Sequence, residues 1–197
     1  FLLGRTGLAN VDQPSTTSTT SQADGTSNAP KITTMEPKEE GLTTQEIVAR
    51  NLDSTVVITM YTKRSGFFGT AGEVQAGAAS GIVWTEDGYI ITNAHCVYND
   101  STRSTYSRIK VTLYNQKEYD AKIVGYDVST DLAVIKIDAT GLKPATFGDS
   151  SKVQLGDRVI VLGNNGGYGW SVTQGIISGL ARDVYEETNY AIKCLQT

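Results

Sequence analysis

The sequence has few histidines and cysteines, no excess of positive charge and no long apolar run, and each of these absences excludes a class of protein. Its 197 residues include one histidine and two cysteines, and the cysteines lie far apart, which excludes a zinc site of paired Cys or Cys/His ligands and a disulfide-dense scaffold. Lys and Arg number 17 against 21 Asp and Glu, which argues against nucleic acid as a partner. No apolar run reaches the roughly 20 residues of a membrane-spanning helix. Since 39% of the residues are hydrophobic, a globular chain is expected.

The first 45 residues lack the composition of a folded segment. Residues 1–4 (FLLG) form a short apolar stretch without an initiator Met, which we interpret as the remnant of something longer. Residues 15–21 are all Ser or Thr, and residues 36–40 are rich in charge without an apolar face. Because such a segment buries little apolar surface, residues 1–45 are predicted to be this remnant followed by a disordered Ser/Thr-rich linker. O-glycosylation or a regulatory role is the alternative for the linker.

From about residue 43 the pattern changes to short strands separated by turns. Thr43, followed three residues later by Glu46, predicts a capped helical turn. Residues 86–88 (EDG) predict a hairpin turn, because Gly accepts the positive φ that this turn requires. We predict strands at residues 55–61, 81–85, 89–92, 109–113, 119–124, 132–137, 158–163 and 171–180, and a loop at residues 64–77. Without long amphipathic helices between the strands, the fold is predicted to be all-β, a sandwich or a barrel.

The single histidine, His95, and the aspartate Asp131 are the candidates for chemistry. Taken alone, a histidine at the end of a strand is more often a structural residue than a catalytic one. A histidine that acts as a general base needs a carboxylate to hold its tautomer and to stabilise the imidazolium. Asp131 supplies a candidate carboxylate, and its alternative role is that of an ordinary turn residue that begins a strand. We interpret Asp127 as such a turn residue.

The segments around both candidates resemble those of serine proteases. Residues 91–97 (ITNAHCV) resemble the segment around the general base of trypsin-like serine proteases. Residues 79–83 (ASGIV) and 88–93 (GYIITN) resemble, more narrowly, the HtrA (Deg) family. Residues 127–136 (DVSTDLAVIK) resemble the family segment that carries the triad aspartate, in the same order of His before Asp. The resemblance covers residues 47–197.

This resemblance implies a trypsin-like double β-barrel. Residues 46–140 would form a complete first β-barrel with His95 and Asp131, and residues 141–197 a partial, truncated second β-barrel. The implied reaction is peptide-bond hydrolysis, in which a serine attacks the scissile carbonyl, His95 takes its proton and Asp131 orients the ring. Neither a metal nor a cofactor is implied.

The serine itself is missing from the sequence. No G-x-S-G-G segment occurs in the 197 residues. Residues 163–167 (GNNGG) look similar, but they follow RVIVL and precede SVTQGIIS, where the family has a turn between strands, so Asn165 is not interpreted as a replaced nucleophile. The family's nucleophile loop would come just after residues 194–197 (CLQT), and this chain is therefore expected to be inactive alone. The alternative function is a catalytically dead, protease-like module that binds proteins.

The resemblance also implies a biological setting. The substrates would be unfolded or damaged envelope proteins, the assembly a homotrimer, and the location extracytoplasmic, with a tether to a bacterial membrane upstream of residue 1. In many trypsin-like proteases the cysteine after the base pairs with one before the preceding hairpin. Residues 75–80 contain no cysteine, so Cys96 is expected to be a free, buried thiol, and a bridge to Cys194 is the alternative.

Overall fold

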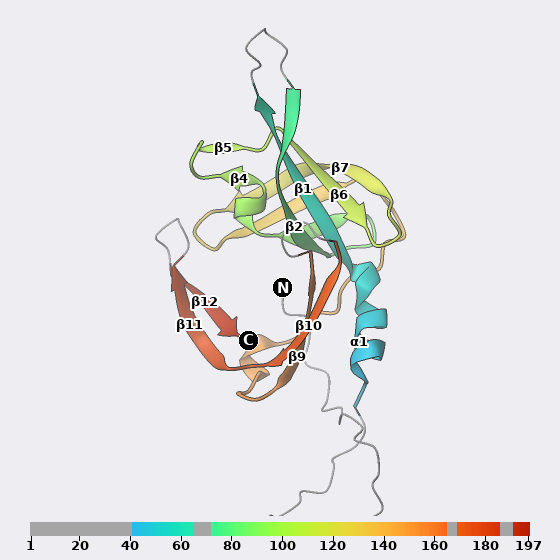
Figure 1. The fold of residues 1–197 in the computed structure, drawn as a ribbon, viewed down its shortest axis with the longest axis vertical. Helices are drawn as coiled ribbons and strands as arrows, with labels where there is room; N and C mark the ends of the chain where they lie inside the picture. The colour runs from blue at the N-terminus through green and yellow to red at the C-terminus, as the bar shows by residue number, and fades with distance from the viewer. Residues whose placement is uncertain (1–40, 65–71, 165–168, 186–190) are drawn as a thin grey trace, which may run out of the picture.

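The structure, a computed structural model, describes residues 41–64, 72–164, 169–185 and 191–197. Strands dominate these ranges (Figure 1). In chain order the elements are α1 (Thr44–Asn51), β1 (Thr55–Arg64), β2 (Gly72–Val83), β3 (Tyr89–Thr92), β4 (Tyr98–Asn99), β5 (Ser104–Thr105), β6 (Arg108–Leu113), β7 (Glu118–Asp127), β8 (Leu132–Ile137), β9 (Arg158–Gly163), β10 (Ser171–Ile176), β11 (Gly179–Tyr185) and β12 (Ala191–Gln196), with three-ten turns at Leu52–Ser54, Ala94–Cys96 and Ser150–Lys152. Residues 1–40 of the remnant and linker predicted at residues 1–45, and Asn165, lie outside the described residues. Within these ranges, no helix has the length and hydropathy to cross a membrane.

Six strands form a closed antiparallel barrel in the order β1-β2-β3-β8-β7-β6. β1 closes the barrel, because it pairs with β2 on one side and with β6 on the other. β6 in turn pairs with β7, and β7 with β8. The prediction of an all-β fold is confirmed, and the first β-barrel is complete.

Alternate side chains of the strands fill this barrel. Every second residue of β6 is buried, as expected for a strand with one face on a core. Among the fully buried side chains are Ile58 of β1, Ile90 of β3, and Ile135 and Ile137 of β8. Because burying such a side chain is worth about 1.5–3 kcal/mol, strands far apart in sequence are held around one apolar core.

Two glycines of the β2–β3 hairpin are required by the shape of the barrel. Gly88 has a φ of +106°, and a Cβ there would lie 2.5 Å from a backbone oxygen of β8. Gly81 points into the core, where a Cβ would lie 2.9 Å from the methyl carbons Cδ1 of Ile58 and Cγ2 of Ile90. The predicted hairpin is confirmed, since β2 ends at Val83 and β3 begins directly after Gly88.

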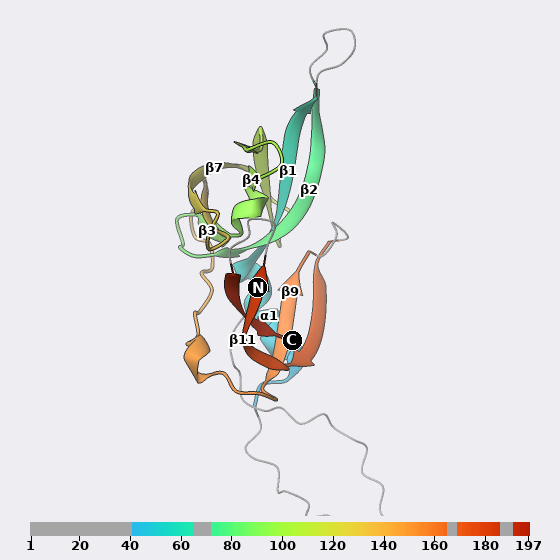
Figure 2. The same ribbon diagram turned by 90° about the vertical axis from the view of Figure 1, so that its left-hand side faces the viewer.

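β1 and β2 extend beyond the rest of the barrel as a long hairpin (Figures 1 and 2). β6 accompanies β1 only as far as Tyr61, whereas β2 pairs with β1 as far as Arg64. The interpretation of residues 64–77 as a loop is therefore wrong at Arg64 and from Gly72 onward, and residues 65–71 lie outside the described residues. Glycine and alanine have low strand propensity, but pairing with β1 determines the conformation of this segment.

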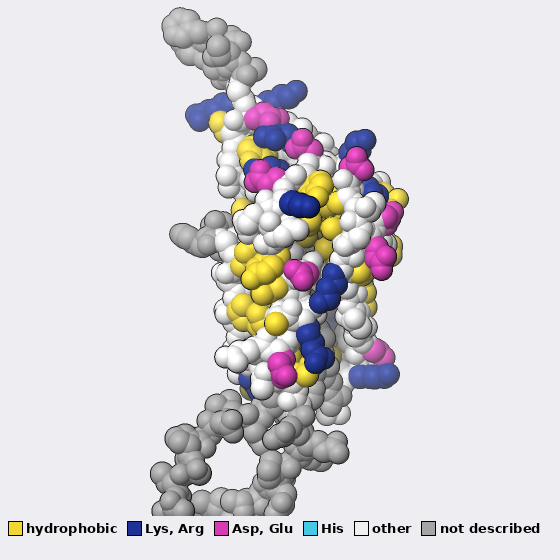
Figure 3. Space-filling model, turned by 90° about the vertical axis from the view of Figure 1, so that its right-hand side faces the viewer, with side chains coloured by type: hydrophobic (Ala, Val, Ile, Leu, Met, Phe, Trp, Pro, Cys, Tyr) yellow, Lys and Arg dark blue, Asp and Glu magenta, His cyan; other side chains and the backbone are white. Residues whose placement is uncertain are grey.

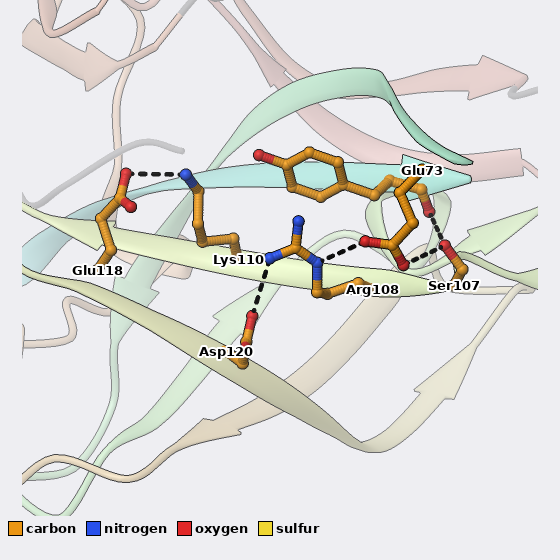
Figure 4. Close-up of polar contacts among 7 residues, drawn as sticks. Glu73, Ser107, Arg108, Lys110, Glu118 and Asp120 are labelled. Atoms are coloured by element: carbon orange, nitrogen blue, oxygen red, sulfur yellow. Dashed lines mark hydrogen bonds and ion pairs between the residues drawn. The ribbon is translucent and has the colours of Figure 1, made fainter. Parts of the chain in front are cut away.

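A polar ladder joins β2, β6 and β7 near the base of this hairpin (Figure 4). Arg108 Nε lies 2.8 Å from Glu73 Oε2, and Arg108 Nη1 lies 3.5 Å from Asp120 Oδ1. The same guanidinium lies over the ring of Tyr61, 4.2 Å from its centroid. Exposed ion pairs contribute less than about 1 kcal/mol each, so the ladder serves mainly to align these strands.

Helix α1 begins with the predicted cap and covers β9. The Thr43 hydroxyl accepts a hydrogen bond from Glu46 N at 3.2 Å, and Glu46 Oε2 accepts one from Thr43 N at 2.8 Å. This reciprocal pair is a capping box, which satisfies two backbone donors at the start of the helix. Ile47 of the helix is buried with Ile160 and Leu162 of β9.

In the described parts of residues 141–197, the strands form two separate two-stranded sheets, β9–β10 and β11–β12. The prediction of one strand over residues 171–180 is wrong, because β10 ends at Ile176 and β11 begins at Gly179. Between them, Ile177 N donates to Asp157 O and Ser178 N to Gln196 O, each at 2.8 Å. These two bonds direct the chain from one sheet to the other. Hydrophobic side chains also reach the surface among charged ones on the face seen in Figure 3.

β2 and β9 meet where the barrel contacts the C-terminal region, residues 141–197. Asn164 N donates to Ser80 Oγ at 2.8 Å. A Cβ at Gly163 would lie 2.9 Å from the same hydroxyl oxygen, so only glycine allows this close approach. The rings of Tyr114 and Trp170 make a further contact between the barrel and the C-terminal region, edge to face with centroids 5.6 Å apart.

Candidate active site

His95 lies in the three-ten turn Ala94–Cys96, which follows β3. Thr92, the last residue of β3, is fully buried, and its hydroxyl donates to Ser80 O of β2 at 2.9 Å. Ala94 and Cys96, on either side of His95, are buried at 2% and 1% exposure. Because both neighbours face the core, His95 faces outward, and 63% of its side chain is exposed.

Asp131 lies in the turn between β7 and β8. Its φ is +51°, a left-handed conformation that is uncommon for residues other than glycine but is tolerated by Asp. β8 is the neighbour of β3 in the barrel, with Thr92 opposite Ala133. The end of β3 therefore meets the beginning of β8, and this adjacency brings the segments of the two candidates together.

The carboxylate of Asp131 lies against the imidazole of His95. His95 Nδ1 lies 2.9 Å from Asp131 Oδ2 and 3.1 Å from Oδ1. His95 N donates to Asp131 Oδ1 at 3.0 Å, and Asn93 Nδ2 donates to Asp131 Oδ2 at 2.9 Å. Only 10% of the Asp131 side chain is exposed. A buried carboxylate that accepts several hydrogen bonds is held in one orientation.

The pKa of His95 is raised from 6.5 to about 9. The side chain of Cys96 is the largest cause; the charge and hydrogen bonds of Asp131 act in the same direction, and partial burial lowers the pKa. Asp131 contributes to this rise because its negative charge and its contact with Nδ1 favour the protonated ring.

This arrangement suits proton transfer at the exposed edge of the imidazole. When Nδ1–H donates to Asp131, the neutral ring carries its free lone pair on Nε2. The ring is mostly exposed, so Nε2 is open to a reacting group. Asp127 is the last residue of β7, at the start of the turn that also carries Asp131. Its carboxylate accepts hydrogen bonds from Ser129 and Thr130 that lower its pKa, those of Ser129 first.

Sequence reasoning missed Asn93 as a member of this site. Its side-chain amide donates to the carboxylate of Asp131 and also to the backbone oxygen of Asp131, the latter at 3.1 Å. The available signal is a polar amide two residues before His95, at the end of an apolar strand. That signal gives no partner, because Asp131 is 38 residues away in sequence.

A cavity of about 750 Å³ adjoins the site at Asn93. Ser150 and Ser151 also line it, and Leu180, Lys193 and Cys194 line it from β11 and β12. It thus lies between the end of β3 and the β11–β12 sheet. In the described part of the chain, no three His, Cys, Asp or Glu side chains gather as metal ligands would. Cys96 is a free, buried thiol, as predicted, and Cys194 is free as well.

Comparison with known proteins agrees with this geometry. The profile described as a trypsin-like peptidase domain matches residues 79–196. Protease Do-like 1, chloroplastic, from Arabidopsis thaliana is 36% identical over 146 residues, which is 73% of this chain and 32% of that protein. The serine protease Do-like HtrB from Bacillus subtilis is 39% identical over 153 residues, which is 72% of this chain and 32% of that protein.

A solved structure shares both the sequence similarity and the fold. The HtrA-type protease AlgW with a decapeptide superposes with a TM-score of 0.61 at 27% identity, over 72% of this chain and 47% of that one. The chain thus spans about a third of the length of these two curated relatives. From the matched profile and the Do-like relatives, the chain belongs to the HtrA family of trypsin-like serine proteases.

Proposed function

We propose that this chain supplies the general base, His95, and its orienting carboxylate, Asp131, to a serine endopeptidase of the HtrA type. The observation that carries the proposal is the contact of 2.9 Å between His95 Nδ1 and Asp131 Oδ2 on a ring that is mostly exposed. A base needs this combination, because one nitrogen must be fixed and the other must be free to accept a proton.

In the proposed reaction, a serine from a segment beyond residue 197 attacks the scissile carbonyl. His95 Nε2 takes the serine proton as the new C–O bond forms, and Asp131 stabilises the resulting imidazolium. His95 then gives the proton to the leaving amine as the C–N bond breaks. Without the serine, turnover falls on the order of 10^6-fold, so the 197-residue chain alone is inactive. Since only the neutral ring can accept the proton, activity rises with pH through the pKa of His95.

We propose unfolded or damaged proteins of the cell envelope as substrates. One relative, from Chlamydia trachomatis, is named a probable periplasmic serine endoprotease and is 45% identical over 53% of this chain. This supports an extracytoplasmic location; plant relatives named chloroplastic give the family a second setting. A homotrimer tethered to a bacterial membrane completes the proposal, and light scattering of the full-length protein tests the trimer.

The second candidate function is a catalytically dead module that binds unfolded proteins. Peptidase assays on the full-length protein distinguish the two candidates. We expect it to cleave unfolded casein and to be labelled by a fluorophosphonate, which reports an activated serine, whereas the 197-residue chain is not labelled. Failure of the folded full-length protein in both assays would favour the binding module.

Single substitutions then test the two roles. His95→Ala should abolish cleavage, and Asp131→Asn should lower kcat about 10^4-fold, because an amide cannot hold the tautomer that leaves Nε2 free. Asp127→Asn is the matched control in the same turn, since the carboxylate of Asp127 bonds to Ser129 and Thr130. A loss of similar size in Asp127→Asn, or full activity in Asp131→Asn, would contradict the assignment.

A further inference from the structure

We infer that Asn93 is a positioning residue for the His95–Asp131 pair: its amide fixes the orientation of the Asp131 carboxylate. This inference deepens the proposed function and rests on it for the effect on catalysis. The geometric part stands on the contacts themselves and can be tested on the 197-residue chain.

The first support is that Asn93 contacts Asp131 at two points. Asn93 Nδ2 donates to Oδ2 of the carboxylate at 2.9 Å and to the backbone oxygen at 3.1 Å. One amide group thereby ties the side chain of Asp131 to its own backbone. Rotation of the Asp131 side chain would therefore break the hydrogen bond between Asn93 Nδ2 and Oδ2.

The second support is the conformation of Asp131. Its backbone φ of +51° costs free energy in a residue other than glycine, so surrounding contacts must stabilise this conformation. The backbone oxygen of Asp131 accepts from Asn93 Nδ2 and also from Ala94 N, each at 3.1 Å. Asn93 thus supplies one of these two hydrogen bonds to the oxygen.

The third support is the division of the carboxylate oxygens. Oδ1 accepts from His95 N at 3.0 Å, which is a backbone donor fixed by the three-ten turn. Oδ2 faces Nδ1 of His95 at 2.9 Å and has Asn93 as its other donor. With Asn93 removed, Oδ2 would depend on the imidazole alone, and the carboxylate would lose the contact that aims this oxygen at the ring.

The test uses the fact that the chain has one histidine. Its ring signal in an NMR titration therefore belongs to His95. We expect Asn93→Ala to lower the pKa of His95 toward 6.5, because a carboxylate free to turn away stabilises the imidazolium less. Asn93→Asp keeps the shape but replaces the donor with a second carboxylate, so the pKa of His95 should stay raised while the aimed contact is lost.

Kinetics of the full-length protein give the second readout. Both Asn93→Ala and Asn93→Asp should lower kcat about 10- to 100-fold, by analogy with residues that orient metal-binding side chains, with KM unchanged. Asn99→Ala is the matched control, since Asn99 Oδ1 accepts from Thr102 N at 3.1 Å in a turn of its own. It should change neither the His95 titration nor kcat.

Three results would overturn the inference. The first is a His95 titration in Asn93→Ala that matches Asn99→Ala. The second is an unchanged kcat in both Asn93 variants. The third is a raised KM with normal kcat, which would make Asn93 a substrate contact in the cavity that it lines. If Asn93→Ala does not fold, the isosteric Asn93→Asp variant decides by its kcat. If His95→Ala remains an active protease, the proposed function fails, while the NMR titration still reports on the geometry.

Discussion

The barrel and residues 141–197 are both built from strands, but the strands pair differently in the two regions. In the barrel, six strands close on themselves around a shared core. In residues 141–197, four strands form two separate pairs. Ile58 and Ile135 of the barrel are fully buried, whereas Val172 and Ile176 of β10 are 45% and 55% exposed.

This difference teaches where a site can be built. A closed barrel buries its apolar side chains without help from other segments, so the ends of its strands hold fixed positions. The hydrogen bonds described above for the His95–Asp131 pair come from barrel strands or the turns between them. The β11–β12 pair contributes the far wall of the cavity.

The largest expected contrast comes from truncating a buried isoleucine of the barrel and an exposed isoleucine of β10. Ile135→Ala should reduce the free energy of unfolding by about 2–5 kcal/mol, because it leaves a cavity in a fully buried core. Ile176→Ala should change it by less than about 0.5 kcal/mol, since this side chain is 55% exposed.

Urea denaturation followed by tryptophan fluorescence measures this contrast. The chain has two tryptophans: Trp84 follows β2, and Trp170 precedes β10. Variants that keep only one tryptophan report separately on the barrel and on residues 141–197. Equal destabilisation by Ile135→Ala and Ile176→Ala would contradict the exposed position of Ile176.

A smaller effect is expected from filling the barrel too tightly. Gly81→Ala should destabilise the protein by about 1–3 kcal/mol, because its Cβ would lie 2.9 Å from Ile58 Cδ1 and Ile90 Cγ2. Gly72→Ala is the matched control on the same strand, since nothing lies within 4 Å of a Cβ there. Thermal melting of the two variants gives the comparison, and equal melting temperatures would contradict the tight fit at Gly81.

The smallest expected effect is the pH dependence of stability that comes from His95 in the barrel. The folded pKa of His95 is about 9, above its ordinary value of 6.5. Its contribution to stability is therefore fully present below pH 6.5 and is lost as the pH rises through 9. The effect is small because 63% of the side chain is exposed to screening solvent. Unfolding measured at pH 6 and pH 9 should show this loss in the natural sequence and not in His95→Gln.

Local signals predicted the turns and caps well. The Asp-Gly turn at Gly88 and the capping box of Thr43 and Glu46 depend on neighbouring residues, and both are present in the structure. The apolar strands at residues 132–137 and 158–163 also match β8 and β9. These features are readable because their stabilising interactions span few residues.

The features that sequence reasoning missed depend on distant partners. Gly72–Gly77 becomes a strand by pairing with β1, against its own propensity. The break at Ile177 and Ser178 is set by Asp157 and Gln196, which come from other segments. Asn93 gains its place in the site only when β3 and β8 become neighbours.

The pairing of Thr92 with Ala133 has a consequence for how folding errors would appear. A slip of one residue between β3 and β8 would displace Asp131 by about 3.4 Å and turn alternate side chains to the opposite face. The contact between His95 and Asp131 would then be lost, although most backbone pairing could re-form. The one histidine is therefore a gauge of strand alignment, and its ring resonance distinguishes a correctly closed barrel from a misaligned one.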